Sequence, residues 1–249
     1  MFKKLLVLCC GVFSMLAHAE EVHVGTVFHS LSPLNEIIRL FEKNTTAKII
    51  VHQESFTTTV LYNQIKEKND LDIVLFGDVK TAVQLERNNL ANKDSRFTYA
   101  FGKLVLWSKN PNLVDAKGEV LISGEFRNIA SLDPSVAPYG FAAQQVLEKL
   151  KRREALQSKW IFIANSGELQ KQVMEDKIDL AFIPLATLNP SKKIEGSLWI
   201  IPKSYYHPIE QQAVLLKRAE NNQVAKAFFE YLKSPQARNI FEKYGFSLP

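Results

Sequence analysis

Small polar side chains gather at four turns that each follow a predicted strand and precede a predicted helix. Their hydroxyl and amide groups can donate hydrogen bonds, and the first backbone N–H groups of a helix have no partner within it. Several such helix ends meeting at one point form an anion site without a cationic side chain. Each turn alone also fits ordinary helix capping. The turns are His29-Ser30, Thr57-Thr58-Thr59, Pro138-Tyr139-Gly140 and Asn165-Ser166-Gly167.

Groups that could make or break bonds are sparse by comparison. After the apolar N-terminal segment the chain has His23, His29, His52 and His207, and none lies three or four residues from another. This spacing excludes a helical zinc motif, and no G-x-S-x-G, phosphate-loop or G-x-G-x-x-G pattern occurs. Only His29 lies at a strand-to-helix turn. We therefore expect a protein that is not an enzyme, holds no cofactor and binds no metal ion directly.

Alternating strands and helices position these turns. Residues 22–28 have the pattern of a strand, and the apolar spacing over 34–41 is that of a helix with Pro33 in its first turn. A second series of strands and helices begins with the strand 103–107. The alternation predicts an α/β fold built around mostly parallel sheets. Ligands of such sheets bind beyond the carboxyl ends of the strands, where the four polar turns lie.

Two such series indicate two lobes. We expect residues 20–102 and 205–249 to form the first lobe and residues 103–204 the second. No low-complexity linker separates the two series, so short crossing strands should join the lobes. We place the hinge near Gly102 and Ser204.

The N-terminus has the pattern of a secretory signal peptide. Lys3 and Lys4 precede an apolar run over 5–16, which is shorter than the roughly 20 residues of a membrane-spanning helix. The run ends in Ala17-His18-Ala19, a small-x-small pattern that signal peptidase cleaves. We expect residues 1–19 to be removed after Ala19 and the mature chain to lie in the periplasm.

Cleavage would change the chemistry of the chain. Both cysteines, Cys9 and Cys10, would leave with the signal, which excludes disulfides, thiolate metal sites and cysteine nucleophiles from the mature protein. Loss of Lys3 and Lys4 would lower the formal charge from +5 to +3. This charge is scattered and far below the basic footprint of a nucleic-acid-binding protein.

Several longer motifs resemble those of periplasmic molybdate-binding proteins. The resemblance is densest near the C-terminus and extends over nearly the whole mature chain. It is carried by Asp72-Ile73-Val74-Leu75-Phe76-Gly77-Asp78, Asp133-Pro134, Ala137-Pro138-Tyr139-Gly140, Asp179-Leu180-Ala181-Phe182-Ile183, Pro208-Ile209-Glu210-Gln211-Gln212-Ala213-Val214-Leu215-Leu216, the stretch 227–237 and Tyr244-Gly245-Phe246.

The resemblance implies a type II periplasmic binding protein fold, in which two Rossmann-like α/β lobes close on a ligand by a hinge. It implies capture of a tetrahedral oxyanion, molybdate and also tungstate, held through its oxygens by neutral donors. Delivery to an ABC importer permease in the inner membrane follows from it, and we expect a monomer. Alternatives are a binding protein for sulfate, phosphate or a small carboxylate, and a periplasmic sensor module of the same fold.

The resemblance also implies ligand contacts from five turns. Tyr139 would act mainly through its backbone N–H, and Pro184 has no donor to offer. His29 could supply the missing hydrogen bond and, if protonated, a positive charge. We expect His29→Ala and Thr58→Ala to weaken binding more than Tyr139→Ala. The five contacts fall on His29 or Ser30, on Thr58, on Tyr139, on Ser166 and on Pro184.

Overall fold

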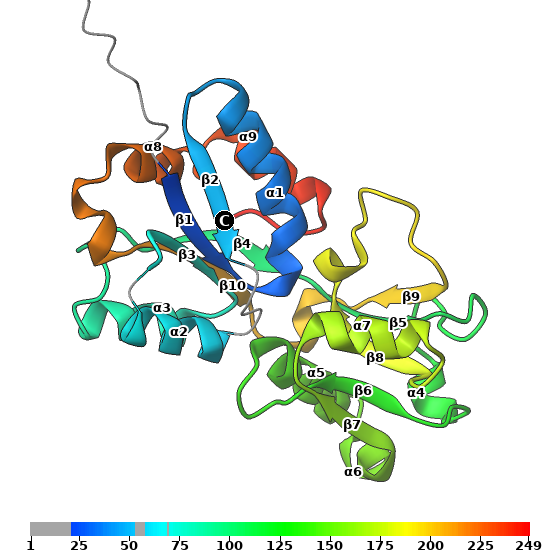
Figure 1. Ribbon diagram of the computed structural model, residues 1–249. Coiled ribbons are helices and arrows are strands. Elements are labelled where there is room, and N and C mark those ends of the chain that lie inside the picture. The colour runs from blue at the N-terminus through cyan, green and yellow to red at the C-terminus, as the bar shows by residue number, and fades with distance from the viewer. Residues whose placement is uncertain (1–20, 53–57, 69) are drawn as a thin grey trace, which may run out of the picture.

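The computed structural model describes residues 21–52, 58–68 and 70–249. Two lobes, each with a five-stranded sheet and covering helices, lie side by side (Figure 1). The predicted signal segment and Thr57 lie outside the described residues. Within the described residues, no helix combines the length and apolar character needed to span a membrane.

The first lobe is assembled from both ends of the described chain. Its sheet has the strand order β2-β1-β3-β10-β4. The elements are β1 (Glu21–Thr26), α1 (Phe28–Lys43), β2 (Lys48–His52), α2 (Thr58–Glu67), β3 (Ile73–Phe76), α3 (Val79–Arg87) and β4 (Phe97–Gly102), then β10 (Ile209–Leu215), the 3₁₀ turn η4 (Lys217–Asn221), α8 (Gln223–Tyr231) and α9 (Pro235–Lys243).

The second lobe is built from the middle of the chain. Its sheet has the order β7-β6-β8-β5-β9. The elements are β5 (Leu104–Ser108), α4 (Val120–Ser123), β6 (Ile129–Leu132), α5 (Pro138–Lys149), α6 (Arg153–Leu156), η1 (Gln157–Lys159), β7 (Trp160–Ile163), α7 (Ser166–Met174), β8 (Leu180–Pro184), η2 (Leu185–Leu188), β9 (Ser197–Ile200) and η3 (Lys203–Tyr205).

The two sheets have the same topology. Three parallel strands lead each sheet, and one strand, β10 in the first lobe and β5 in the second, runs antiparallel to both of its neighbours. Four strands of each sheet therefore point the same way, as expected for a mostly parallel sheet. Each antiparallel strand is the first strand after the chain enters that lobe from the other, so the crossing explains its reversed direction.

The chain crosses between the lobes twice. Only Lys103 separates β4 of the first lobe from β5 of the second, and the return path runs from β9 through η3 to β10. These short segments agree with joining by crossing strands, and they pass close to Gly102 and Ser204. The lobe boundaries and hinge positions inferred from the sequence stay predictions.

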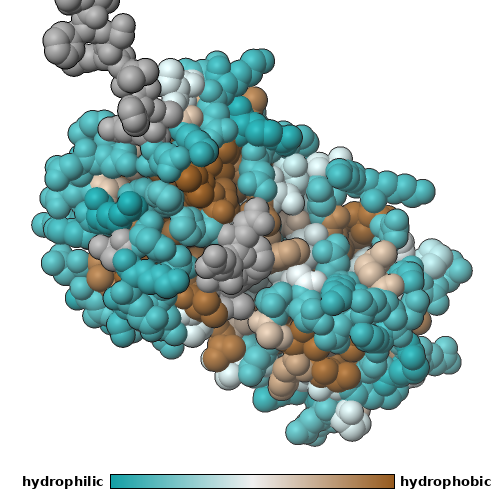
Figure 2. Space-filling model, viewed as in Figure 1, coloured by the Kyte–Doolittle hydropathy of each residue, from teal (hydrophilic) through white to brown (hydrophobic). Residues whose placement is uncertain are grey.

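Each lobe has its own hydrophobic core. In the first lobe one cluster packs under α1, α8 and α9 and a second packs under α2 and α3, so both faces of the sheet are covered. The second lobe has one larger cluster that includes Trp107 and Phe182. On the face that Figure 2 shows, hydrophilic residues cover most of both lobes, and hydrophobic patches lie among these hydrophilic residues.

Helix α1 begins earlier than the sequence pattern predicts. It starts at Phe28, so His29 and Ser30 lie in its first turn and Pro33 lies inside it. The prediction that Pro33 opens the helix is therefore wrong. The helix begins after Val27, whose extended backbone ends the strand and whose side chain cannot cap a helix. With no capping residue to mark it, this start has no local sequence signal.

Candidate functional site

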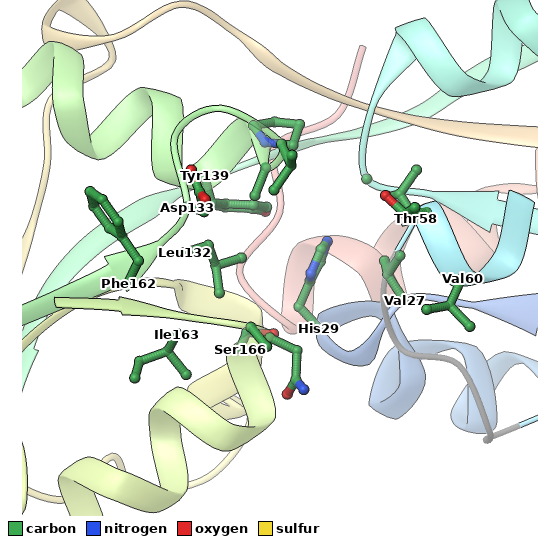
Figure 3. A pocket seen from close by; sticks show the side chains of 17 residues that line it. Val27, His29, Thr58, Val60, Leu132, Asp133, Tyr139, Phe162, Ile163 and Ser166 are labelled. Carbon is green, nitrogen blue, oxygen red and sulfur yellow. The ribbon is translucent and has the colours of Figure 1, made fainter.

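A cavity of about 580 Å³ lies between the lobes, at the carboxyl ends of the strands (Figure 3). The first lobe contributes the start of α1, the start of α2 and Gly77 at the end of β3. The second lobe contributes the turns from β6 to α5 and from β7 to α7. Four helices, α1, α2, α5 and α7, thus begin at one cavity, with two from each lobe.

The structure brings together four of the six candidate residues. His29, Thr58, Tyr139 and Ser166 all line the cavity. They lie in the first turns of α1, α2, α5 and α7. The positive end of each helix dipole and its first amide groups therefore face the same space.

Ser30 and Pro184 do not line this cavity. Ser30 is fully buried, and its hydroxyl shares a 2.8 Å hydrogen bond with the hydroxyl of Tyr99. Pro184 ends β8 and pairs with Leu104 in the middle of the second sheet. Ser30 therefore supports α1 from behind, and Pro184 is a strand residue whose missing donor does not concern the cavity wall.

His29 is held by a residue from the distant strand β10. Its Nε2 lies 2.8 Å from Oε1 of Gln211, which is fully buried. The ring also meets the Tyr139 ring edge-on, with centroids 4.9 Å apart. Burial lowers the pKa of His29 to about 4, although the hydrogen bond to Gln211 raises it in part. His29 is thus neutral at pH 7 in the ligand-free protein, so the condition for a positive charge, a protonated ring, is not met here.

Tyr139 joins the lobes through its ring. Its side chain is 2% exposed, and its hydroxyl has no hydrogen-bond partner among the described residues. A side chain at Gly102 would place a Cβ atom 2.0 Å from this hydroxyl. Burial raises the Tyr139 pKa well above its ordinary value. Tyr139→Ala would leave a large cavity, so the expectation that this change matters least is not supported by its packing.

The start of α5 presents backbone donors. Ala137 precedes the helix and makes no side-chain cap, and Pro138 at the first position has no N–H. The first amide of this helix that can donate is therefore that of Tyr139. Gly140 lets α5 approach β6 closely, because a Cβ atom there would lie 2.2 Å from the carbonyl oxygen of Leu132.

The start of α7 faces the start of α1 across the lobes. Asn165 caps α7, with its Oδ1 accepting a 2.8 Å hydrogen bond from the Glu168 amide. Gly167 packs against the ring of Phe28, where a Cβ atom would be 2.7 Å away. Ser166, which is 3% exposed, lies between Asn165 and Gly167 at the cavity wall.

The charge in the cavity wall is small. Among the described residues that line it there is no lysine or arginine, and Asp133 is the one carboxylate. The Asp133 Oδ1 accepts hydrogen bonds from both the Ser135 hydroxyl and the Ser135 amide, which lower its pKa. An anion held here therefore has no lysine or arginine side chain to pair with, and hydroxyl, amide and imidazole groups are the donors that the wall can offer. No group of three or more His, Cys, Asp or Glu side chains in the described chain is placed to hold a metal ion.

A family model described as bacterial extracellular solute-binding protein matches residues 27–247. This match spans almost the whole described chain. The chain belongs to this family. Two molybdate-binding proteins named ModA are among its relatives. That of Azotobacter vinelandii is 37% identical over 240 residues, with 96% of this chain and 94% of the relative covered. That of Rhodobacter capsulatus is 33% identical over 233 residues, with 92% and 89% covered.

A solved structure also resembles this solute-binding protein over most of its length. The periplasmic molybdate-binding protein of Azotobacter vinelandii superposes with a TM-score of 0.85 and 35% identity, covering 92% of this chain and 99% of the other. The predicted resemblance and the predicted type II periplasmic binding protein fold are both confirmed. The matched relatives are binding proteins.

Sequence patterns did not reveal the role of Gln211 in this solute-binding protein. It lies 182 residues from His29 and follows the alternation of an ordinary strand. One signal in the sequence could have drawn attention to it. Glu210, Gln211 and Gln212 form a polar run in a strand whose other residues are apolar, and in the structure the pairing of β10 with β4 shifts register between Gln211 and Gln212. A buried polar side chain in such a strand must find a partner.

Proposed function

We propose that this chain captures a tetrahedral oxyanion, molybdate and also tungstate, and delivers it to the permease of an ABC importer. The observation that carries the proposal is the meeting of four helix starts at a cavity whose described lining has no lysine or arginine. Such a wall suits a small anion, because fixed amides and hydroxyls set both distance and direction. The names of the two ModA relatives support molybdate as that anion.

The proposed contacts come from both lobes. Thr58 and the first turn of α1 would act from the first lobe, and Ser166 and the Tyr139 amide from the second. Hydroxyl and amide donors to a charged ligand contribute about 1.5–3 kcal/mol each. An ion bound by both lobes would hold them together, which couples capture to closure.

The rim of the cavity supports closure of this kind. Val136 is 70% exposed, Phe162 51% and Val60 47%, and all three line the cavity. Val60 belongs to the first lobe and the other two to the second. Bringing the lobes together would remove apolar surface from water, which stabilises the closed form by about 25 cal/mol per Å².

The proposal includes the site of action. The solved relative is a periplasmic protein, and the apolar N-terminal segment of this chain has the signal pattern described above. We therefore propose that the chain is exported to the periplasm and cleaved after Ala19. The mature protein would then dock as a monomer on an inner-membrane permease. The solute leaves chemically unchanged, since binding requires no catalytic group.

A titration with four anions tests the proposal. The mature chain, residues 20–249, is titrated with molybdate, tungstate, sulfate and phosphate by calorimetry, and its melting temperature is followed in parallel. We expect molybdate and tungstate to bind most tightly. At a ligand concentration of about 100 Kd, binding adds roughly 2.7 kcal/mol and raises the melting temperature by several degrees. Tighter binding of sulfate or phosphate would reassign the solute, and no response to any of the four would refute anion capture.

A further inference from the structure

The ring of His29 lies between the cavity and the buried amide of Gln211. The Nε2 of Gln211 donates to the carbonyl of Ile209 at 3.2 Å and approaches that of Gly77 at 3.5 Å. Both of these neighbours are acceptors, so they settle which way the amide points. Its Oε1 therefore faces His29.

This orientation decides the tautomer of His29. Oε1 of Gln211 can only accept, so Nε2 of His29 carries a hydrogen and donates to it over 2.8 Å. In a neutral ring the other nitrogen, Nδ1, then has a lone pair and no hydrogen. Nδ1 makes no hydrogen bond to a described residue, and His29 forms part of the cavity wall. The ring thus offers an acceptor, where an oxyanion needs a donor.

We propose that Gln211 is a positioning residue that couples ligand binding to proton uptake at His29. This inference rests on the proposed function. A fully deprotonated oxyanion has only acceptor oxygens, so it can bond to Nδ1 only after Nδ1 has taken a proton from the solvent. Nε2 keeps its hydrogen bond to Gln211 throughout. An oxyanion that carries its own proton would instead donate a hydrogen bond to Nδ1, and no proton would be taken up from the solvent.

Among the described residues, the groups packed around His29 leave the ligand as the main source of negative charge. Tyr139 from α5 is neutral, because burial raises its pKa, and Phe246 from the C-terminal segment is apolar. Gly77 faces the ring from the turn after β3. The carboxylate of the next residue, Asp78, accepts a hydrogen bond from the Thr81 amide. The first turn of α1 has no acidic residue.

Asp133 is the remaining charged group among the described residues of the cavity wall, and it lies in the turn from β6 to α5. Its carboxylate accepts two hydrogen bonds from Ser135, so it stays ionised and turned onto its own loop. A dianion bound to Nδ1 would place a negative charge in hydrogen-bond contact with the ring and favour the imidazolium form of His29. Burial keeps the ring neutral until such a charge arrives, since it lowers the His29 pKa to about 4.

The affinity for the oxyanion should rise as the pH falls. Protonation is easier in the complex than in the free protein, so affinity rises as pH falls from the His29 pKa of the complex towards about 4. With one proton taken up, Kd falls by up to about tenfold for each pH unit within that window.

Calorimetry with micromolar molybdate between about pH 5.5 and 8 measures this coupling. Runs in two buffers with different ionisation enthalpies give the number of protons taken up for each ion bound. We expect uptake that grows towards lower pH in the natural protein. His29→Asn keeps a donor but cannot titrate, so its Kd should change little with pH. His207→Asn changes an exposed histidine outside the cavity and should leave the full pH dependence in place.

Variants at Gln211 test the positioning role. Gln211→Leu removes the acceptor that holds the hydrogen on Nε2, so Nδ1 can carry it instead and proton uptake should fall. Gln211→Glu places a carboxylate against Nε2 and should move the pH window of Kd upward. Side-chain ¹⁵N NMR of the natural protein is a third measurement that does not depend on how these variants fold. It should show Nδ1 without a hydrogen before molybdate is added and with one afterwards.

Three results would overturn the inference. They are a molybdate Kd that does not change with pH, equal pH dependence in His29→Asn and the natural protein, or an NMR signal of Nδ1–H in the ligand-free protein. Tight molybdate binding together with any of these leaves the proposed function standing. Absence of binding for all four oxyanions at every pH would refute the proposed function and this inference together.

Discussion

The two lobes share a strand order but differ in the antiparallel strand that backs the site. In the first lobe this strand is β10, whose buried Gln211 holds the side chain of His29. Its counterpart in the second lobe, β5, has an apolar sequence up to Ser108, and the Tyr139 hydroxyl has no partner among the described residues. Related topologies therefore serve different tasks. The first lobe orients a side chain, and the second offers backbone amides against an apolar wall.

The largest effect is expected where α5 approaches its sheet. Gly140→Ala would place a Cβ atom 2.2 Å from the carbonyl oxygen of Leu132, so the start of α5 and the Tyr139 amide must move. A displacement of about 1 Å can cost roughly 100-fold in a site that depends on position. Calorimetry should show at least this loss in molybdate affinity. Gly124→Ala is the control, since a Cβ there meets nothing within 4 Å, and it should lower stability through its positive φ of 73° with Kd unchanged.

The stability of the first lobe should depend on pH through His29. The His29 pKa is about 4 in the folded protein and near 6.5 in the unfolded chain. Between these pH values His29 therefore binds a proton only in the unfolded chain. The ligand-free protein should therefore lose roughly 3 kcal/mol of unfolding free energy from this group as pH falls from about 6.5 to 4. Urea unfolding at several pH values measures it. His29→Asn should lack this component and His207→Asn should keep it, and identical pH profiles for both would contradict the burial of a neutral His29.

A smaller effect is expected from the hydroxyl at the start of α2. Thr58→Val keeps the shape of the side chain but removes its donor, which should weaken molybdate binding about tenfold, the equivalent of 1.4 kcal/mol. Thr45→Val is the matched control, because the Thr45 hydroxyl bonds to Phe41 at the far end of α1. Equal affinities of Thr58→Val and the natural protein would remove Thr58 from the site.

The smallest effect is expected at the unpartnered hydroxyl of the second lobe. Tyr139→Phe keeps the ring that packs on His29 and removes a buried hydroxyl without a hydrogen bond in the described chain. The melting temperature should stay equal or rise slightly, and Kd should change less than about threefold, since a group without a partner contributes little. A clear loss of affinity in this variant would show that the hydroxyl contacts the ligand.

Much of the architecture could be predicted from sequence, because apolar periodicity and strand-helix alternation reflect burial in each lobe. The polar residues at the starts of α2, α5 and α7 were also accessible, since threonine, proline and asparagine mark helix starts. Helices α5 and α7 nevertheless begin at Pro138 and Ser166, before the predicted starts at Phe141 and Glu168. Edge strands β4 and β9 are not among the predicted elements, because half-buried, mixed sequences give a weak pattern.

The misplaced parts of the site have a common physical cause. Helix α1 begins after Val27 with no capping residue, so the sequence offers both His29 and Ser30 as the ligand contact, although Ser30 bonds to Tyr99 inside the lobe. Gln211 reaches His29 from 182 residues away, and its contact depends on the pairing of β10. Contacts that only tertiary structure creates leave no local pattern in the chain.

We propose that both lobes hold one oxyanion between their helix starts. A crystal of the mature protein grown with molybdate, with X-ray data collected at the molybdenum absorption edge, tests it most directly. We expect an anomalous peak in the cavity, within hydrogen-bond reach of the Tyr139 amide and the Thr58 and Ser166 hydroxyls. A molybdenum peak elsewhere, or a peak held by one lobe alone, would contradict it.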